Sequence, residues 1–391
     1  MKRNAGRLVR CTTSPEHFSA FVPAPLPPEP PLVISPDIQE LLEQANRALG
    51  RLDGIGALLP DTQLFLYSYL RKEALLSSQI EGTQSSFSDL LLYENEEAPG
   101  VPLGDVQEVS SYVAALEHGL RRIRAGFPLS LRLIREVHEI LLSQGRGSHQ
   151  SPGEFRRSQN WIGGTRPGNA RYVPPPHDLV MDCLGALEKF LHNDPVPTPT
   201  LIKAALAHVQ FESIHPFLDG NGRVGRLLIT LLLCAEGALT EPLLYLSLYL
   251  KLHREDYYTL LQQVRETGDW EAWLRFFLQG VQETAEQGAA TTRSLLQLFR
   301  EDRERIEGLG RAAASALRVF SQMQTTPIFS VSRIANTLEL SLPTASAAVR
   351  NLEGLGVIRE LTGRRRGRLF VYRRYLDILS EGTEPLRPDQ A

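Results

Sequence analysis

Hydrophobic and polar positions follow a helical period over most of the chain. Apolar residues recur every three or four positions in segments 37–52, 61–82 and 106–123, and this spacing predicts amphipathic helices. The same pattern predicts further helices over 130–144, 177–193, 200–213, 226–239, 251–268 and 269–308. The sequence therefore predicts a mainly α protein.

Three stretches break the helical pattern. Residues 22–36, "VPAPLPPEPPLVISP", are rich in proline and are expected to run extended over the surface. Residues 83–104 are expected to be a connection. Within residues 151–176, turn residues frame two short β-like pieces, "NWIGG" and "ARYVP". These pieces predict a small β-hairpin, or flap.

The last part of the chain has a different pattern. From residue 331 it favours a helix, a turn, a second helix with Ser341 as its cap, and then two strands around the basic turn "TGRRRGR". This order resembles a winged helix-turn-helix, in which the second helix enters the DNA major groove and the wing meets phosphates. The residues expected to contact DNA are Thr344, Ser346, Arg350, Arg364, Arg365 and Arg366. Contact with a protein is the alternative use of such a unit.

The length of 391 residues predicts more than one domain. We expect an N-terminal helical region over 1–104, a core over 105–285, a helical linker over 286–310 and the winged helix-turn-helix over 311–391.

Composition narrows the class of protein. Hydrophobic residues make up 42% and charged residues 22%, as in soluble globular proteins. The longest apolar run, 227–239, contains Thr230 and Glu236 and is too short and polar to span a bilayer. No secretory signal is visible, and three widely spaced cysteines suggest neither a disulfide framework nor a zinc site. We therefore expect a cytoplasmic protein that does not bind a membrane.

Charge is distributed unevenly. Residues 311–375 hold eleven arginines and three acidic residues, a net charge of +8, although the whole chain has a net charge of −3. A basic terminal unit on an acidic body favours DNA as a partner of that unit.

The stretch "HPFLDGNGRVGR", residues 215–226, combines charge with glycine in a way that indicates phosphate chemistry. If a helix begins near Gly220, its first N–H groups and the glycines form an anion-binding concavity, and Arg223 and Arg226 can grip further phosphate oxygens. A carboxylate at Asp219 suits a Mg²⁺ ion that bridges phosphates, and His215 suits a general base. The pattern predicts a nucleoside triphosphate with its metal.

This stretch resembles the motif of the Fic family, His-Pro-Phe-x-(Asp/Glu)-Gly-Asn-Gly-Arg-x-x-Arg, at every fixed position. The resemblance implies a Fic-type helical core with a flap, and an enzyme that transfers AMP from ATP to a protein hydroxyl with release of pyrophosphate. It implies that His215 is the base and Asp219 the Mg²⁺ ligand. It further implies that the phosphates are held by Gly220, Asn221, Gly222, Arg223 and Arg226.

A second stretch, "SSQIEG", resembles the Fic inhibitory motif (Ser/Thr)-x-x-x-Glu-(Gly/Asn) through Ser77, Glu81 and Gly82. The resemblance implies that Glu81 pairs with Arg226 and represses transfer. The family also suggests a tentative adenine pocket at Tyr245, Leu246 and Tyr249. At the flap we expect target binding by Trp161, Ile162, Tyr172 and Val173.

The expected partners are a target protein, the chain itself as an acceptor, DNA, and a second copy in a homodimer. Two alternatives stay open. The Fic body of a DNA-binding regulator would only sense nucleotide, and the same site would remove AMP in a de-AMPylase. An intact His215 and Asp219 favour the transferase, since sensing needs no base.

Overall fold

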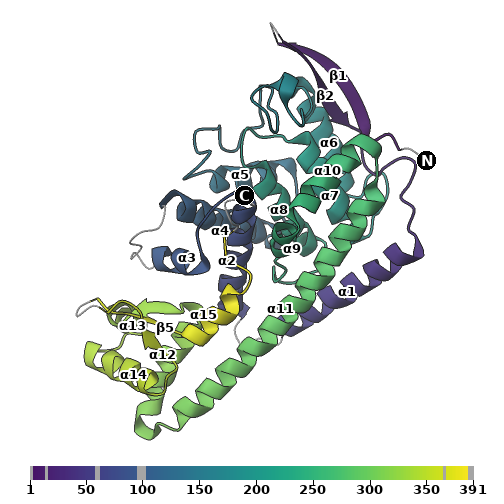
Figure 1. Cartoon of the computed structure of the whole chain (residues 1–391). Helices are drawn as coiled ribbons and strands as arrows, with labels where there is room; N and C mark the ends of the chain where they lie inside the picture. Colours follow the sequence, from purple (N-terminus) through teal and green to yellow (C-terminus); the bar gives the residue numbers. More distant parts are fainter. Residues whose placement is uncertain (1–2, 14–15, 58–61, 95–102, 364–366, 386–391) are drawn as a thin grey trace.

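The computed structural model describes residues 3–13, 16–57, 62–94, 103–363 and 367–385, and over these residues the chain is mostly helical (Figure 1). The body contains β1 (Gly6–Thr13), β2 (Glu16–Pro23), α1 (Pro36–Ala57), α2 (Thr62–Ile80), α3 (Phe87–Glu94), α4 (Leu103–Arg124), α5 (Leu131–Leu141), α6 (Val180–Leu191), α7 (Thr200–Ile214), α8 (Asn221–Ala235), α9 (Ser247–Leu252), α10 (Arg254–Thr267) and α11 (Trp270–Glu307). The C-terminal unit contains α12 (Ala313–Thr325), β3 (Ile328–Ser330), α13 (Val331–Thr337), α14 (Leu342–Gly354), β4 (Arg359–Glu360), β5 (Leu369–Val371) and α15 (Arg373–Ser380).

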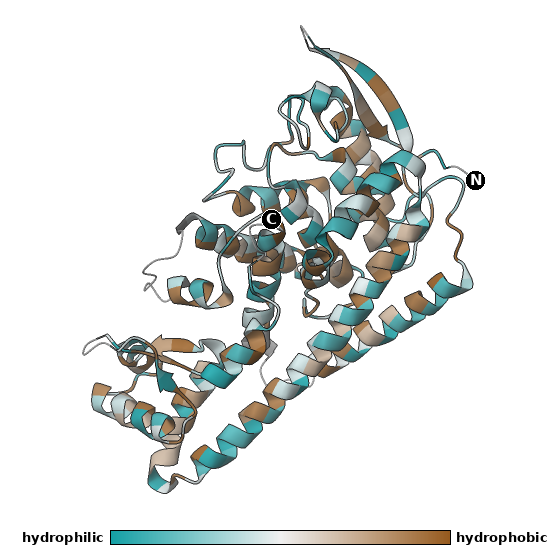
Figure 2. Cartoon of the chain, viewed as in Figure 1, coloured by the Kyte–Doolittle hydropathy of each residue, from teal (hydrophilic) through white to brown (hydrophobic). Residues whose placement is uncertain are grey.

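Helix α7 lies at the centre of the body. Every residue from Leu201 to Ile214 is buried, so this helix has no solvent face and must be covered on all sides. Helices α6 and α8 pack directly against it, and α4 packs against α5 and α8. Hydrophobic residues concentrate on these central helices, whereas α11 mixes hydrophobic and hydrophilic positions along its length (Figure 2). The turn between α7 and α8 is therefore held by the best-packed part of the protein.

The long helix α11 connects the body to the C-terminal unit. It runs beside α1 for much of its length and continues past it to α12 (Figure 1). Among the described residues, none of the helices has the length and apolar character that crossing a bilayer requires.

Three expectations about the elements need correction. Residues 6–23 form a hairpin, β1 paired antiparallel with β2, that the helical pattern did not predict. The expected connection over 83–104 contains helix α3. The predicted flap hairpin is a loop with a single β-bridge, between Ile162 and Tyr172, because its glycines and prolines leave too few residues in extended conformation to build a ladder.

The C-terminal unit has the predicted order of helix, turn, helix and two strands. Its sheet has the order β3-β5-β4, with both pairs antiparallel. The predicted cap is confirmed, since the Ser341 hydroxyl accepts a hydrogen bond from Thr344 N at 3.3 Å. Its assignment as a winged helix stays a prediction.

Candidate active site

The turn that joins α7 to α8 holds the predicted motif in a fixed shape. His215 ends α7 in the left-handed region at φ 48°, and Gly220 precedes α8 at φ 76°. The buried Asn221 side chain closes the turn, because its Oδ1 accepts from Phe217 N at 2.8 Å and its Nδ2 donates to Phe217 O at 2.9 Å. The amide of Asn221 is thus used to hold the loop. Its predicted contact with phosphate then rests on its backbone N–H.

His138 on α5 packs against this turn, and the sequence of the motif did not predict this contact. Its ring stacks on Phe217 with centroids 3.6 Å apart. Its Nδ1 accepts from Gly153 N at 2.8 Å, so Nε2 carries the proton and donates to Asp219 O at 3.1 Å. Burial lowers the pKa of His138 to about 4, and the ring stays neutral. His138 therefore positions the backbone that carries Asp219.

Arg156, at the start of the flap, is a second residue that sequence reasoning missed. It is buried, and its guanidinium donates to His215 O at 2.9 Å and to Pro175 O at 2.6 Å. Asn160 adds a bond from Nδ2 to Phe217 O at 2.9 Å. These bonds tie the flap to the motif turn, so the two parts of the site are positioned together.

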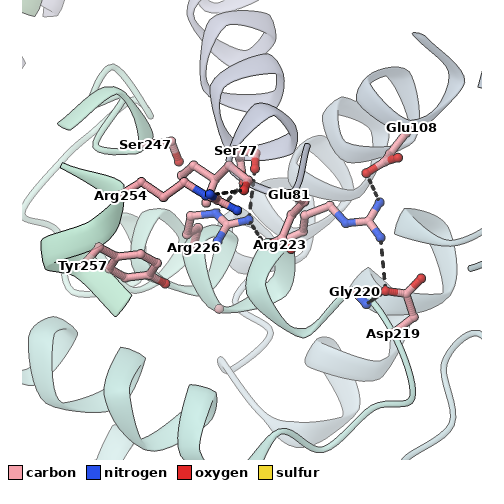
Figure 3. A network of polar contacts seen from close by, with 12 residues as sticks. Ser77, Glu81, Glu108, Asp219, Gly220, Arg223, Arg226, Ser247, Arg254 and Tyr257 are labelled. Atoms are coloured by element: carbon pink, nitrogen blue, oxygen red, sulfur yellow. Dashed lines mark hydrogen bonds and ion pairs between the residues drawn. The ribbon is translucent and has the colours of Figure 1, made fainter. Parts of the chain in front are cut away.

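Arg226 is bound by the inhibitory motif (Figure 3). It is 2% exposed and lies one turn into α8. Its Nε donates to Ser77 Oγ at 2.8 Å, and its Nη2 donates to Ser77 O at 3.0 Å and to Glu81 Oε1 at 2.7 Å. The structure thus brings the two predicted motifs together, and Ser77 and Glu81 occupy the side of Arg226 that faces α2.

The end of α2 presents Glu81 to this arginine. Gly82 has φ +98°, a conformation that stops the helix, and its N–H donates to Gln79 O at 3.1 Å. Two arginines complete the cap, since Arg254 donates to Ile80 O at 3.2 Å and Arg146 donates to Glu81 O at 3.3 Å. Glu81 therefore lies on a well-anchored turn.

Glycine at position 222 leaves the room that Glu81 occupies. A Cβ built on Gly222 would lie 2.2 Å from Glu81 Oε1, closer than atoms can approach. The predicted phosphate-binding glycine thus also permits the Glu81 carboxylate to enter the same concavity.

The charges of this pair stabilise each other. Burial raises the pKa of Glu81, but Arg226, Arg223 and Arg146 outweigh it, and the pKa is lowered overall. Burial lowers and Glu81 raises the pKa of Arg226, with a net upward direction. Both groups are charged at neutral pH. Removal of the carboxylate would leave a buried guanidinium that keeps its hydrogen bonds to the Ser77 oxygens but loses its carboxylate partner.

Arg223 lies between two carboxylates. Its Nη1 is 2.7 Å from Glu108 Oε1, with both side chains buried, and its Nη2 is 3.8 Å from Asp219 Oδ1 (Figure 3). The Asp219 side chain is 34% exposed, and its Oδ1 also accepts from Gly220 N at 2.7 Å. Arg223 and Asp219 therefore face the same side of the turn.

His215 is half-buried at the end of α7. Burial, together with the positive charges of Arg265 and Arg156, lowers the pKa of its imidazole to about 3. The ring is thus neutral at physiological pH and able to accept a proton.

A cavity of about 520 Å³ opens between the flap and α10. Its walls include Ile162 and Tyr172 of the flap, the buried Glu212, and Arg254, Tyr258 and Arg265 of α10. Tyr245, Leu246 and Tyr249 do not line it, because they are buried in the core with at most 5% of each residue exposed. These three residues therefore do not contribute to this cavity, and the adenine pocket stays a prediction.

The four predicted flap residues divide into two pairs. Trp161 is exposed and Ile162 half-buried. Tyr172 is buried, donating its hydroxyl to Ser213 O at 2.6 Å, and the buried Val173 accepts from Phe21 N of β2 at 2.8 Å. Trp161 is thus the most exposed of the four, while Ile162 and Tyr172 contribute to the wall of the cavity.

The predicted DNA contacts lie far from this site in the sequence, on and after α14. Thr344 and Arg350 are exposed and Ser346 is half-buried. Arg364, Arg365 and Arg366 lie outside the described residues. Within the part of the chain that the structure describes, no group of three or more metal-ligating side chains is found.

Comparison with known proteins agrees with this geometry. Residues 39–121 match the family described as Fic/DOC family, N-terminal, and residues 128–233 match the Fic/DOC family. The protein adenylyltransferase Fic of Aedes aegypti is 36% identical over 161 residues, which cover 40% of this chain and 28% of that protein. The protein of the same name from Drosophila melanogaster is 34% identical over 161 residues, covering 40% of this chain and 29% of that protein. The match thus spans less than a third of the length of these relatives.

A Fic family protein from Desulfovibrio desulfuricans G20, known from its crystal structure, has a similar fold. It covers 88% of this chain and 98% of its own, with a TM-score of 0.56 and 21% sequence identity. The likeness supports the arrangement of the helices.

Proposed function

Since the chain belongs to the Fic/DOC family through residues 39–121 and 128–233, we propose that it is a protein adenylyltransferase whose resting state is repressed by Glu81. It transfers AMP from ATP to a hydroxyl of a target protein or of the chain itself, and it releases pyrophosphate. One observation carries the proposal: a single turn and the helix that follows it bring together a neutral imidazole, the N-terminus of a helix and two arginines three positions apart.

The N-terminus of α8 supplies the phosphate site. The first N–H groups of a helix have no partner within it and point along the axis toward the loop. Gly220 and Gly222 allow phosphate oxygens to approach that backbone closely, and Arg223 and Arg226 add forked donors. These groups favour a chain of phosphates that runs across the start of α8.

His215 acts as the base. The hydroxyl oxygen of the acceptor attacks the α-phosphorus, the bond from that phosphorus to the oxygen bridging to the β-phosphate breaks, and pyrophosphate leaves with the bond's electrons. The acceptor proton passes to the imidazole of His215. Its lowered pKa makes it a weak base in the resting protein, and the negative triphosphate raises that pKa when it binds.

Asp219 fits a Mg²⁺ site. Mg²⁺ is held by one or two carboxylates together with the phosphates of the substrate, so a cluster of protein ligands is not required. Gly220 N holds the partly exposed carboxylate of Asp219 beside the proposed phosphate site, and His138 holds the backbone carbonyl of the same residue. A bound Mg²⁺ would neutralise phosphate charge there.

The cavity beside the flap suits the nucleoside. It lies next to the turn, and Tyr258 and Ile162 offer apolar surface for a base. Gln262 and Arg265 offer donors on the same wall. The exposed Trp161 lies on the outer side of the flap, where an acceptor segment would dock beside His215.

Glu81 represses the reaction by occupying Arg226. The Glu81 carboxylate lies 2.7 Å from the guanidinium that would bind the γ-phosphate. The triphosphate is therefore held in a position that does not allow in-line attack on its α-phosphorus. Repression ends when the turn at the end of α2 moves away.

Intact-protein mass spectrometry after incubation with ATP and Mg²⁺ tests the proposal. Glu81→Gly should gain one AMP or more, wild type much less, and Glu81→Gly combined with His215→Ala none. A Glu81→Gly protein that binds ATP but transfers nothing would instead favour a nucleotide-sensing regulator.

The C-terminal unit is proposed to bind DNA. Thr344 and Arg350 are exposed on α14, and the unit is strongly basic. Affinity for duplex DNA should fall steeply with salt, and Arg350→Glu should weaken it. The paired control is Arg293→Glu, an exposed arginine on α11 outside the unit.

A further inference from the structure

Helix α2, which ends in the inhibitory turn, is bound along its length by the last third of the chain. Near its start, Ser68 Oγ lies 2.9 Å from Tyr375 OH of α15. On the next residue, Tyr69 OH donates to Gly288 O of α11 at 2.9 Å and lies 2.8 Å from Thr292 Oγ1. All three contacts are buried, so the position of α2 depends on elements that are distant in sequence.

The chain continues from α15 as a short segment, Gly382–Glu384, which we name the strap. After α15 it runs along α2 toward the centre of the body (Figure 1). Gln79 Nε2 donates to Thr383 O at 2.8 Å, and Thr383 is 3% exposed. From the other side, Lys251 Nζ donates to Gly382 O at 3.2 Å and to Glu384 O. The strap is thus fixed through its backbone by two buried side chains.

Gln79 joins the strap directly to the inhibitory turn. It lies two residues before Glu81 and is fully buried. Its side chain also donates to Ser85 O at 3.0 Å, and its carbonyl accepts from Gly82 N at 3.1 Å. The residue therefore holds the turn from before and after Glu81, while it is itself held by Thr383.

Charge adds to this attachment. Lys72 on α2 is 2% exposed, and the carboxylates of Glu381 and Glu384 favour its protonated form. Burial disfavours the charged form of Lys72, and the two carboxylates offset part of that cost. The chain segment that carries Glu381 and Glu384 therefore stabilises α2 in its observed position.

We propose that the strap is a latch on autoinhibition: while it binds Gln79 and Lys251 the turn keeps Glu81 on Arg226, and its detachment releases the turn. The latch rests on the proposed repression by Glu81 and gives it a control point. Since α15 leads directly into the strap, a movement of the C-terminal unit pulls on the turn that blocks the phosphate site. Binding at that unit and transfer at His215 are thereby coupled.

Gly382 offers a way to open the latch in the full-length protein. A Cβ at this position would lie 2.9 Å from Leu248 Cδ1, so Gly382→Leu wedges the strap away from α9. Gly356→Leu is the matched control, because Gly356 also has a positive φ, +68° against +78°, but has open space around it. Truncation after Ser380 and Lys251→Met remove strap contacts without a wedge, and they separate detachment from misfolding.

Two measurements are made on each variant, with and without Glu81→Gly. Hydrogen–deuterium exchange of residues 78–84 should rise roughly fivefold to tenfold when the strap is detached, since the buried bond from Gln79 and the two partly buried bonds from Lys251 are lost. Labelling by ATP that is radioactive at the α-phosphate should rise by a similar factor. The rise should be absent when Glu81→Gly is already present, because both changes then act on one step.

Unchanged exchange in Gly382→Leu and in the truncated chain would overturn the latch. The latch would also be overturned if Gly382→Leu and the truncated chain labelled at the wild-type rate while Glu81→Gly was active. It would be overturned as well if these two changes raised labelling by the same factor with and without Glu81→Gly. If no variant transfers AMP, including Glu81→Gly, the proposed function fails, and the exchange of residues 78–84 still decides whether the strap holds the turn.

Discussion

Replacing Glu81 in graded steps tests the central electrostatic argument. Glu81→Gln keeps the shape and a neutral acceptor for Arg226. Glu81→Ala removes both and frees the space beside Gly222, and Glu81→Gly also loosens the backbone of the turn. A hydrogen bond to a charged group contributes about 1.5–3 kcal/mol, so removing the pair should raise the unrepressed population roughly 10- to 150-fold. We expect the lower part of that range, because the Glu81 side chain is 29% exposed.

The assay is the initial rate of self-labelling with ATP that is radioactive at the α-phosphate. Rates should increase in the order wild type, Gln, Ala, Gly. Glu136→Gln is the matched control, since Glu136 also pairs with arginines and has a similar exposure, 25%, but its arginine partners are Arg122 on α4 and Arg132 on α5. The reasoning is refuted if all three Glu81 variants bind ATP and label at the wild-type rate.

Three further predictions follow from the site. The pH profile of kcat/KM should show no acid limb near 6.5, because the free protein holds the pKa of His215 at about 3. Glu212→Gln should stabilise the protein relative to wild type, and the gain should grow from pH 4.5 to 7 to at most roughly 3 kcal/mol. Burial raises the pKa of Glu212 from 4.5 to about 7 in the folded state, so the wild-type protein loses stability over this pH range as the unfolded chain ionises first. Asn221→Ala should lower the free energy of unfolding by roughly 2–4 kcal/mol in urea, because Phe217 N and O lose their partners.

Each of these has its own control. The pH profile could show an acid limb at pH 6 to 7 that disappears when a residue other than His215 is replaced. Such a limb would report the titration of that other residue. Glu255→Gln, an exposed carboxylate on the same cavity wall, should show no such pH-dependent gain. Asn221→Asp keeps the acceptor for Phe217 N and should lie between wild type and Asn221→Ala.

Local signals predicted much of the fold, and the reason is visible in particular residues. The period of apolar positions gave α7 and α11 within two residues at each end, and Ser341 caps α14 as its residue type indicated. The hairpin β1–β2 was not predicted. The hairpin lies against the flap through Phe21 N and Val173 O, a contact that no local pattern records.

The adenine pocket shows the same limit inside the site. The resemblance to the Fic family placed the pocket at Tyr245, Leu246 and Tyr249, but aromatic residues fill cores as readily as pockets. The packing of α9 buries them, and α10 supplies Tyr258 and Arg265 to the cavity instead. His138 and Arg156 escaped notice because each acts on the motif turn through bonds to its backbone, for which a sequence has no signature.

The sequence by itself determined the chemistry of the turn, because its charged groups, its glycines and its helix start are neighbours along the chain, and short-range sterics place them. It also determined that Ser77 and Glu81 share one helix end. Only the tertiary structure decided that this end meets Arg226, that the cavity opens along α10, and that Thr383 holds Gln79. Those contacts join residues far apart in sequence, and their geometry is set by how the buried faces of the helices pack.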